Sequence, residues 1–268
     1  MALIKKCPEC GKKFLFSAKL CPNCGCPTEA IDPGLKFTLS EDGGSYFIVK
    51  YKGKSRDLVI PSTYNGKPVT EIGNEAFKDN SALTSVTIPD SVTNIGYEAF
   101  SHCSGLTSVT IGAGVTNIGS FAFSCCRGLT SVTIPNSVMS IGRYAFQFCS
   151  GLTSVTIGNS VKKIGDFAFS GCSGLTSVTI PNSVTSIGWG AFYDCSGLTS
   201  VTIPSSVTSI GDWAFKDCTA LTVITFQGTE EEWNAIEKED DWDENLGNGS
   251  YHIRFAAEAR KGFDDFDF

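Results

Sequence analysis

Histidine is scarce in this chain of 268 residues, and so are the motifs of enzymes. The only two histidines, His102 and His252, lie in no pattern typical of a nucleophile or a metal site. Serines are abundant but occur as repeated residues without an evident His–Asp pair, and neither a phosphate-binding loop nor a dinucleotide fingerprint is present. We therefore expect a protein that is not an enzyme and has no small-molecule substrate.

Long hydrophobic runs are also missing. A membrane-spanning helix needs about 18–20 consecutive apolar residues, and no segment approaches this length. The first residues, MALIKKCPEC, have neither the apolar core nor the cleavage site of a secretory signal. We therefore expect a cytoplasmic protein without a membrane span. The alternative is a cell-surface protein exported by a route that needs no signal peptide.

Positive charge is sparse over most of the chain. The net charge is −7, and from Gln227 onward 13 acidic residues stand against four basic ones. The remainder is close to neutral, with a small excess of lysine in the first 30 residues. A nucleic-acid groove needs clustered lysine and arginine, so this distribution argues against nucleic acid as the main partner.

What the chain does have is a repeat of 23 residues. A fixed period in this range with one short strand per unit is typical of a solenoid. The period is visible in the leucines that begin each unit: Leu83, Leu106, Leu129, Leu152, Leu175, Leu198 and Leu221.

Each unit predicts one short strand. In the second unit Val109 and Ile111 alternate with Ser108 and Thr110, so the apolar pair should point inward and the hydroxyls outward. Stacked units then make a parallel sheet with an uncharged serine–threonine face. The glycine after each returning isoleucine, such as Gly119, suits either a positive φ or close backbone contact. The predicted fold is a mostly β, α/β-type repeat solenoid with a parallel sheet.

Two cysteine pairs precede the repeats. Cys7 and Cys10 with Cys21 and Cys24 form CxxC-x10-CxxC, which can close a tetrahedron of thiolates around Zn²⁺. The segment resembles the short zinc ribbons of many bacterial proteins. Four protein ligands leave no open position, so we expect a structural zinc ion. Two disulfides are the alternative, and the nearby lysines leave open a nucleic-acid contact through the ribbon.

Six further cysteines occupy one position of the repeat. We expect buried, reduced thiols, because parallel side chains on neighbouring units do not favour disulfide geometry. This cysteine ladder consists of Cys103, Cys126, Cys149, Cys172, Cys195 and Cys218.

The repeat itself, LTSVTIPxSVTxIGxxAFxxCSG, resembles the BspA-like leucine-rich-repeat family over about residues 35–255. Residues Gly34–Arg56 resemble the family's N-terminal hairpin, and the segment from Tyr64 to Val69 its longer first repeat. Trp233–Ile236 with Trp242 and Tyr251 resembles its C-terminal cap. Surface members of the family are implied to bind host or matrix proteins, which makes an adhesin-like bacterial surface protein a functional alternative.

These features divide the chain into five parts. They are a zinc ribbon (1–28), a linker (29–34), the solenoid with its hairpin (35–226), a C-terminal cap (227–257) and an acidic tail (258–268).

The pairs of residues between Ile-Gly and Ala-Phe vary among the units, and six of them contain one aromatic residue each. If exposed, these aromatics form a stripe with the composition of a protein-binding surface; alternatively, they cover gaps between turns of the solenoid. The stripe residues are Tyr97, Phe121, Tyr144, Phe167, Trp189 and Trp213. The expected function is a non-catalytic scaffold for an unidentified protein partner.

Overall fold

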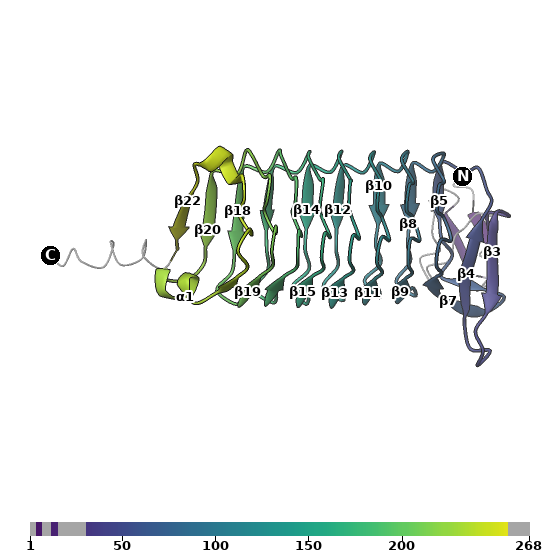
Figure 1. Cartoon of the computed structure of the whole chain (residues 1–268). Coiled ribbons are helices and arrows are strands. Elements are labelled where there is room, and N and C mark those ends of the chain that lie inside the picture. The colour runs from purple at the N-terminus through teal and green to yellow at the C-terminus, as the bar shows by residue number, and fades with distance from the viewer. Residues whose placement is uncertain (1–3, 7–11, 16–30, 257–268) are drawn as a thin grey trace.

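The computed structural model describes residues 4–6, 12–15 and 31–256. Strands β1 (Ile4–Lys6) and β2 (Lys13–Leu15) pair antiparallel near the N-terminus. The cysteines expected to bind zinc, Cys7, Cys10, Cys21 and Cys24, lie outside the described residues, and so does the acidic tail. From β5 (Asp57–Val59) onward the chain winds into an elongated solenoid, in which each 23-residue unit makes one coil (Figure 1).

One side of the solenoid, the serine–threonine wall, is built from parallel strands that stack Ser on Ser and Thr on Thr. Its backbone pairing divides into a five-stranded and a four-stranded sheet between β14 and β16. The wall consists of β5 (Asp57–Val59), β8 (Ser85–Thr87), β10 (Ser108–Thr110), β12 (Ser131–Thr133), β14 (Ser154–Thr156), β16 (Ser177–Thr179), β18 (Ser200–Ile203), β20 (Val223–Phe226) and β22 (His252–Phe255).

A second side, the isoleucine wall, is an 11-stranded sheet. The sequence predicts the return of the chain here but not a second sheet, because most of these strands are two residues long and too short for an alternating pattern. The wall contains β3 (Leu35–Leu39), β4 (Tyr46–Tyr51), β6 (Thr63–Tyr64), β7 (Lys67–Ile72), β9 (Asn94–Ile95), β11 (Asn117–Ile118), β13 (Ser140–Ile141), β15 (Lys163–Ile164), β17 (Ser186–Ile187), β19 (Ser209–Ile210) and β21 (Glu237–Lys238).

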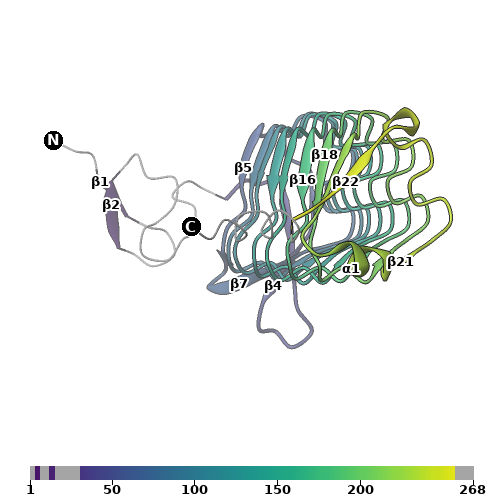
Figure 2. The same ribbon diagram turned by 90° about the vertical axis from the view of Figure 1, so that its left-hand side faces the viewer.

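The third side, the phenylalanine side, runs from the glycine after the isoleucine to the cysteine of each coil and has no regular strand. Its backbone is nevertheless bonded from coil to coil. The N–H groups of Tyr144, Phe146 and Phe148 donate to carbonyl oxygens of the next coil at 2.9, 2.8 and 2.7 Å. Figure 2 views the stack from its C-terminal end and shows that successive coils have nearly the same outline.

The repeated glycines serve close backbone contact and not a positive φ. Gly142 has no positive φ, but a Cβ atom there would lie 2.6 Å from the carbonyl carbon of Gly119 in the preceding coil. The left-handed conformation occurs two residues later, at Tyr144 (φ 58°), and again at Phe148 (φ 55°). The second of the two expectations for these glycines is therefore the correct one.

The core is dominated by a column of phenylalanines, one per coil, in which neighbouring rings stack at 4.7–5.5 Å between centroids. Tyr51 continues the column at its N-terminal end, 5.2 Å from Phe77, and Trp242 closes it beyond Phe215 at 6.2 Å. The first of these contacts comes from the antiparallel β3–β4 hairpin and the second from the cap. Both ends of the apolar column are thus covered by aromatic side chains from outside the regular repeats.

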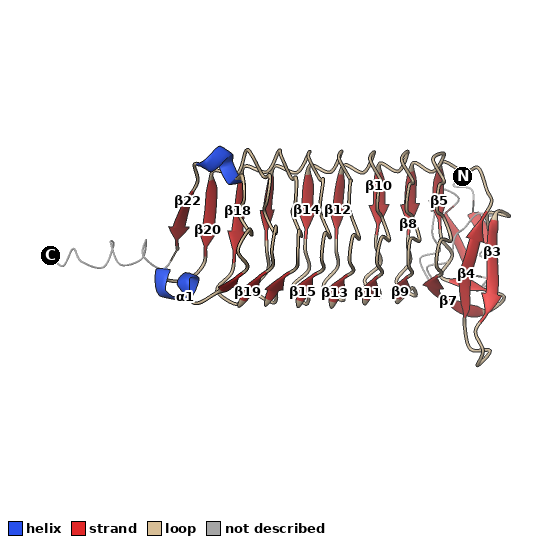
Figure 3. Ribbon diagram, in the orientation of Figure 1, coloured by secondary structure: helices blue, strands red, loops and turns tan. Residues whose placement is uncertain are grey.

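The described helices lie at the C-terminal end (Figure 3): α1 (Glu230–Asn234) and the 3-10 helix η1 (Leu246–Gly249). Thr229 and Glu232 form a capping box at the start of α1, which satisfies the backbone N–H groups of both residues. The helix places the buried Trp233 against Phe226 at 5.3 Å. Within the described residues, no helix is long and apolar enough to cross a membrane.

The cysteine ladder lies inside the solenoid beside the phenylalanine column, and all six side chains are buried. The Cys149 thiol donates to the carbonyl oxygen of Phe123 in the preceding coil at 3.1 Å, and the other five thiols make the equivalent bond. Burial raises the pKa of the Cys172 thiol to about 12. The repeat therefore selects cysteine because it is small and still supplies a weak donor to a buried carbonyl.

We predict that Phe146→Ala lowers the free energy of unfolding by about 3–5 kcal/mol, because it removes a fully buried ring from the middle of the column. Met139→Ala is the matched control, since Met139 is 63% exposed and its loss should cost less than about 0.5 kcal/mol. Urea titration measures both values, and equal effects of the two substitutions would contradict the assignment of the core.

We predict that stability falls as the pH rises above about 9, where unfolded cysteine ionises but the buried ladder stays protonated. The native state then holds more protons than the unfolded state, so each buried thiol contributes a slope of about −1.4 kcal/mol per pH unit. The slope persists up to the native pKa, which for Cys172 is about 12.

Cys172→Ala should therefore make the pH dependence of unfolding between about pH 9 and 11 less steep by roughly this slope. Thr179→Ala on the exposed wall should leave it unchanged. Identical slopes for wild type and Cys172→Ala would show that this thiol is accessible to hydroxide in the native state.

Candidate interaction surface

The six aromatic residues singled out in the sequence form one continuous column, here called the aromatic stripe. Phe121 stacks on Tyr144 at 4.5 Å, and Tyr144 stacks on Phe167 at 5.1 Å, with interplanar angles of 13° and 2°. Tyr97 adds to one end at 5.7 Å, while Trp189 follows Phe167 at 5.4 Å. Trp213 completes the column at 5.4 Å from Trp189.

Two different backbone positions supply these rings. Phe121, Tyr144, Phe167 and Trp213 adopt positive φ values of 54–58° at the second position of the variable pair. Tyr97 and Trp189 come from the first position. A side chain at Gly190, which takes the second position beside Trp189, would clash with the ring of Phe167. Glycine there leaves room for the stack to continue into the two tryptophans.

The stripe lies on the surface, although its rings also cover the joints between coils. Tyr97 and Trp189 are 43% and 42% exposed, and the other four side chains are half-buried. The two interpretations offered by the sequence therefore describe the same rings, whose faces pack on neighbouring coils while their edges remain accessible. Partly exposed aromatic side chains held in place by packing bury large areas on binding at little cost in conformational entropy.

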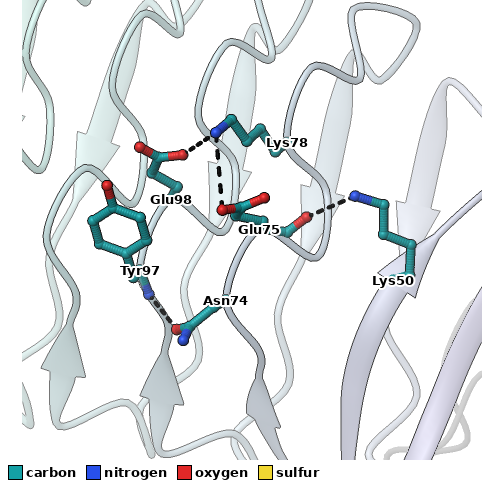
Figure 4. A network of polar contacts seen from close by, with 6 residues as sticks. All are labelled: Lys50, Asn74, Glu75, Lys78, Tyr97 and Glu98. Atoms are coloured by element: carbon teal, nitrogen blue, oxygen red, sulfur yellow. Dashed lines mark hydrogen bonds and ion pairs between the residues drawn. The ribbon is translucent and has the colours of Figure 1, made fainter.

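Polar groups border the N-terminal end of the stripe (Figure 4). The Tyr97 N–H donates to Asn74 Oδ1 at 2.8 Å, and Lys78 forms an ion pair with Glu98. Lys78 Nζ also lies 4.0 Å from Glu75 Oε1, and Lys50 donates to the Glu75 carbonyl oxygen at 3.3 Å. The hydrogen bond and ion pair with Lys78 lower the pKa of Glu98, so this carboxylate remains ionised at neutral pH.

Cations also lie beside the stripe farther along the solenoid. The Arg143 guanidinium is 5.6 Å from the Tyr144 ring centre and bridges to Asp166 at 3.3 Å. Lys216 Nζ is 4.7 Å from the Trp213 ring centre and 2.6 Å from Glu244. The aromatic surface is thus interrupted by cation–carboxylate pairs at the level of particular coils, so different levels present different chemistry to a partner.

Two aromatic residues of this surface were missed by the sequence analysis. Tyr193 lies 6.4 Å from both Phe167 and Trp213, and Phe148, on the same side of the solenoid, is 45% exposed beside Gly171 of the next coil. Both belong to repeat positions just after the core phenylalanine, which vary among coils as the aromatic pair does. The variation in sequence at those two positions could have identified Phe148 and Tyr193 as part of the variable surface.

The serine–threonine wall offers a second, chemically different surface. Ser108, Thr110, Ser131 and Thr133 are exposed, while the threonine that precedes each pair donates its hydroxyl to the backbone of the preceding coil, as Thr130 does at 3.3 Å. His102 and His252 are both exposed, one on the phenylalanine side and one on the last strand of this wall. The two histidines are therefore in different parts of the surface.

Comparison with known proteins places this architecture. The model of the family described as "BspA type Leucine rich repeat region" matches this chain over residues 70–172 and 140–238. A leucine-rich repeat protein from T. pallidum is 30% identical with a TM-score of 0.56, covering 74% of this chain and 85% of that one. A leucine-rich repeat protein from Bacteroides ovatus is 23% identical with the same TM-score of 0.56, covering 85% of this chain and 71% of that one. At this identity the match shows the fold alone.

No curated protein matches the chain significantly. The matched residues together span more than half of the chain, and they coincide with the coils that carry the two parallel walls and the phenylalanine column. This chain belongs to the BspA-type leucine-rich repeat family.

Proposed function

We propose that the protein is a non-catalytic protein-interaction scaffold whose aromatic stripe makes the principal contact. The observation that carries this proposal is that partly exposed, stacked aromatic rings occur at the positions where the coils differ in sequence. A partner that recognises one level of an otherwise regular solenoid must read such positions. Aromatic residues are also the type most often responsible for binding energy at protein interfaces.

The part of the stripe around Phe167, Trp189 and Trp213 has the features of a contact centre. It combines an exposed tryptophan with the neighbouring Tyr193 and the Lys216–Glu244 pair. The serine–threonine wall has uncharged hydroxyls at nearly every level, which gives a partner little basis for choosing one level over another. We therefore place the specific contact on the stripe.

To test this, a photo-crosslinking amino acid is introduced at Trp189. The matched control carries it at Thr133, an exposed residue of the serine–threonine wall. We expect one predominant crosslinked protein from position 189 that is absent from position 133. Binding of that purified partner should weaken at least about 100-fold when Tyr144, Phe167, Trp189 and Trp213 are all changed to serine.

The control for this variant is Ser131→Ala combined with Thr133→Ala, which should bind normally. Thermal unfolding of each variant separates a loss of binding from a loss of folding. Equal crosslinking from positions 189 and 133, or full binding by the folded quadruple variant, would show that the stripe does not make the principal contact.

We further propose that Cys7, Cys10, Cys21 and Cys24 hold one structural Zn²⁺ in an N-terminal ribbon. The support is the chemistry of the donor set: four thiolates with two-residue spacing within each pair satisfy tetrahedral zinc without an added ligand. The antiparallel β1–β2 pair includes residues on both sides of the first cysteine pair. The zinc ion would organise a segment that is too short to form a hydrophobic core of its own.

Metal analysis of the purified chain should give one zinc per molecule. Cys10→Ser should lose the metal, because it removes one of four ligands, whereas Cys125→Ser on the solenoid should retain it. Full zinc content in Cys10→Ser, or no zinc in wild type purified without chelators, would contradict the ribbon.

The thiol chemistry also supports a reducing location, and we propose that the protein works in the cytoplasm. Six buried thiols donate hydrogen bonds to carbonyl oxygens, and thiolate zinc ligands are likewise maintained under reducing conditions. Cell fractionation with surface proteolysis should recover the intact chain in the cytoplasmic fraction. Recovery on the cell surface would favour the adhesin-like alternative instead.

A further inference from the structure

The two ends of the solenoid carry opposite charge. Among the described residues, 31–56 contain five basic and three acidic residues, whereas 227–256 contain two basic and nine acidic ones. The coils between them, residues 57–226, contain seven basic and ten acidic residues, so the charge difference is concentrated at the ends of an elongated molecule. Figure 1 places the β3–β4 hairpin and α1 at opposite ends of the stack.

The N-terminal end presents an open, lysine-lined cavity. Lys36, Lys52 and Lys54 line a cavity of about 640 Å³ together with Gly34 and Gly53. The three lysine side chains are exposed, and Lys36 is held by the Pro33 carbonyl oxygen at 3.1 Å. A side chain at Gly34 would overlap the backbone of Gly53. The two glycines therefore allow their backbone segments to lie against each other in the lining of the cavity.

The acid within this cavity is already engaged. Asp32 accepts hydrogen bonds from the Gly34 N–H at 2.7 Å, from the Tyr51 hydroxyl at 2.9 Å and from the Ser55 hydroxyl. Its carboxylate thus accepts hydrogen bonds from uncharged donors around the cavity and forms no described ion pair with a lysine. The described ion pairs do not include Lys36, Lys52 or Lys54, so their charge is available to a carboxylate from outside.

The C-terminal end presents the complementary surface. Between Glu230 and Glu244 there are nine acidic residues and a single lysine. Glu239, Asp240 and Asp241 are consecutive and exposed, directly after the last strand of the isoleucine wall. The lone Lys238 turns inward and donates to the carbonyl oxygens of Trp233 and Ile236 at 2.7 and 3.0 Å. Glu244 is paired with Lys216, whereas the described ion pairs do not include Glu239, Asp240 or Asp241.

The sheets at this end also stop without a further strand among the described residues. β22 pairs with β20 on one side, and its N–H groups alternate in direction along a parallel ladder. Because His252 and Ala256 donate to the preceding coil, the N–H groups of Ile253 and Phe255 point to the open edge. The end of the solenoid thus offers both negative charge and backbone groups to an approaching surface.

We propose that copies of this chain associate end to end, with the acidic C-terminal end of one copy against the lysine-lined N-terminal end of the next. Like ends repel, so the contact is head-to-tail, and between opposite ends of an elongated molecule such a contact extends into a linear chain. End-to-end association would leave the aromatic stripe accessible along the side and repeat it from copy to copy.

Sedimentation velocity of the full chain over about 5–200 μM tests this proposal. In roughly 20 mM salt we expect the sedimentation coefficient to rise with concentration, and in about 0.5 M NaCl the rise should vanish because opposite charges are screened. The combined substitution Lys36→Glu, Lys52→Glu and Lys54→Glu should weaken association at least about tenfold. So should Glu239→Lys with Asp240→Lys and Asp241→Lys.

A chain carrying both sets of charge reversals should associate again, because complementarity is restored. Lys162→Glu with Lys163→Glu, on the side of the solenoid, is the control and should associate as wild type does. A chain that stays monomeric at every concentration in low salt would overturn the proposal, as would association that survives either set of reversals. Binding of generic DNA or RNA at the lysine-lined end, without self-association, would assign that end to nucleic acid instead.

Discussion

Backbone hydrogen bonding from each coil to the next is the constraint on which the structure depends. A coil of 23 residues has only two to four residues in each strand, so it cannot satisfy its own N–H and C=O groups. Both walls and the phenylalanine side therefore direct these groups to neighbouring coils. The close approach that this demands explains the glycine after each isoleucine, the stacking of identical rings and the small buried cysteine.

This constraint also separates the residues that build the solenoid from those that distinguish its parts. A position that stacks on itself in every coil cannot change freely, which is why leucine, valine, isoleucine, phenylalanine and cysteine recur. The exposed positions beside the phenylalanine column are free to differ, and there the chain places rings such as Trp213 beside pairs such as Lys216–Glu244. The two ends of the solenoid, beyond which no further coil follows among the described residues, carry most of the charge.

The repeat was sufficient to predict the solenoid, the inward Val109 and Ile111 and the buried cysteines, because a period reports directly on stacking. It did not reveal the isoleucine wall, since two-residue strands have no alternation to detect. Nor did it show that Tyr144 and Phe148 take positive φ, which depends on how the chain turns between coils. The stripe residues were identifiable from their variation, whereas the inward turn of Lys238 and the close approach of Gly34 to Gly53 depend on the three-dimensional path of the chain.

Hydrogen exchange of the native protein, resolved by residue, tests the central claim most directly. If coil-to-coil bonds hold all three sides, the amides of Tyr144, Phe146 and Phe148 should exchange as slowly as that of Val132 on the serine–threonine wall, although they lie outside regular secondary structure. Rapid exchange of these three amides, at rates typical of exposed turns while Val132 stays protected, would contradict the account.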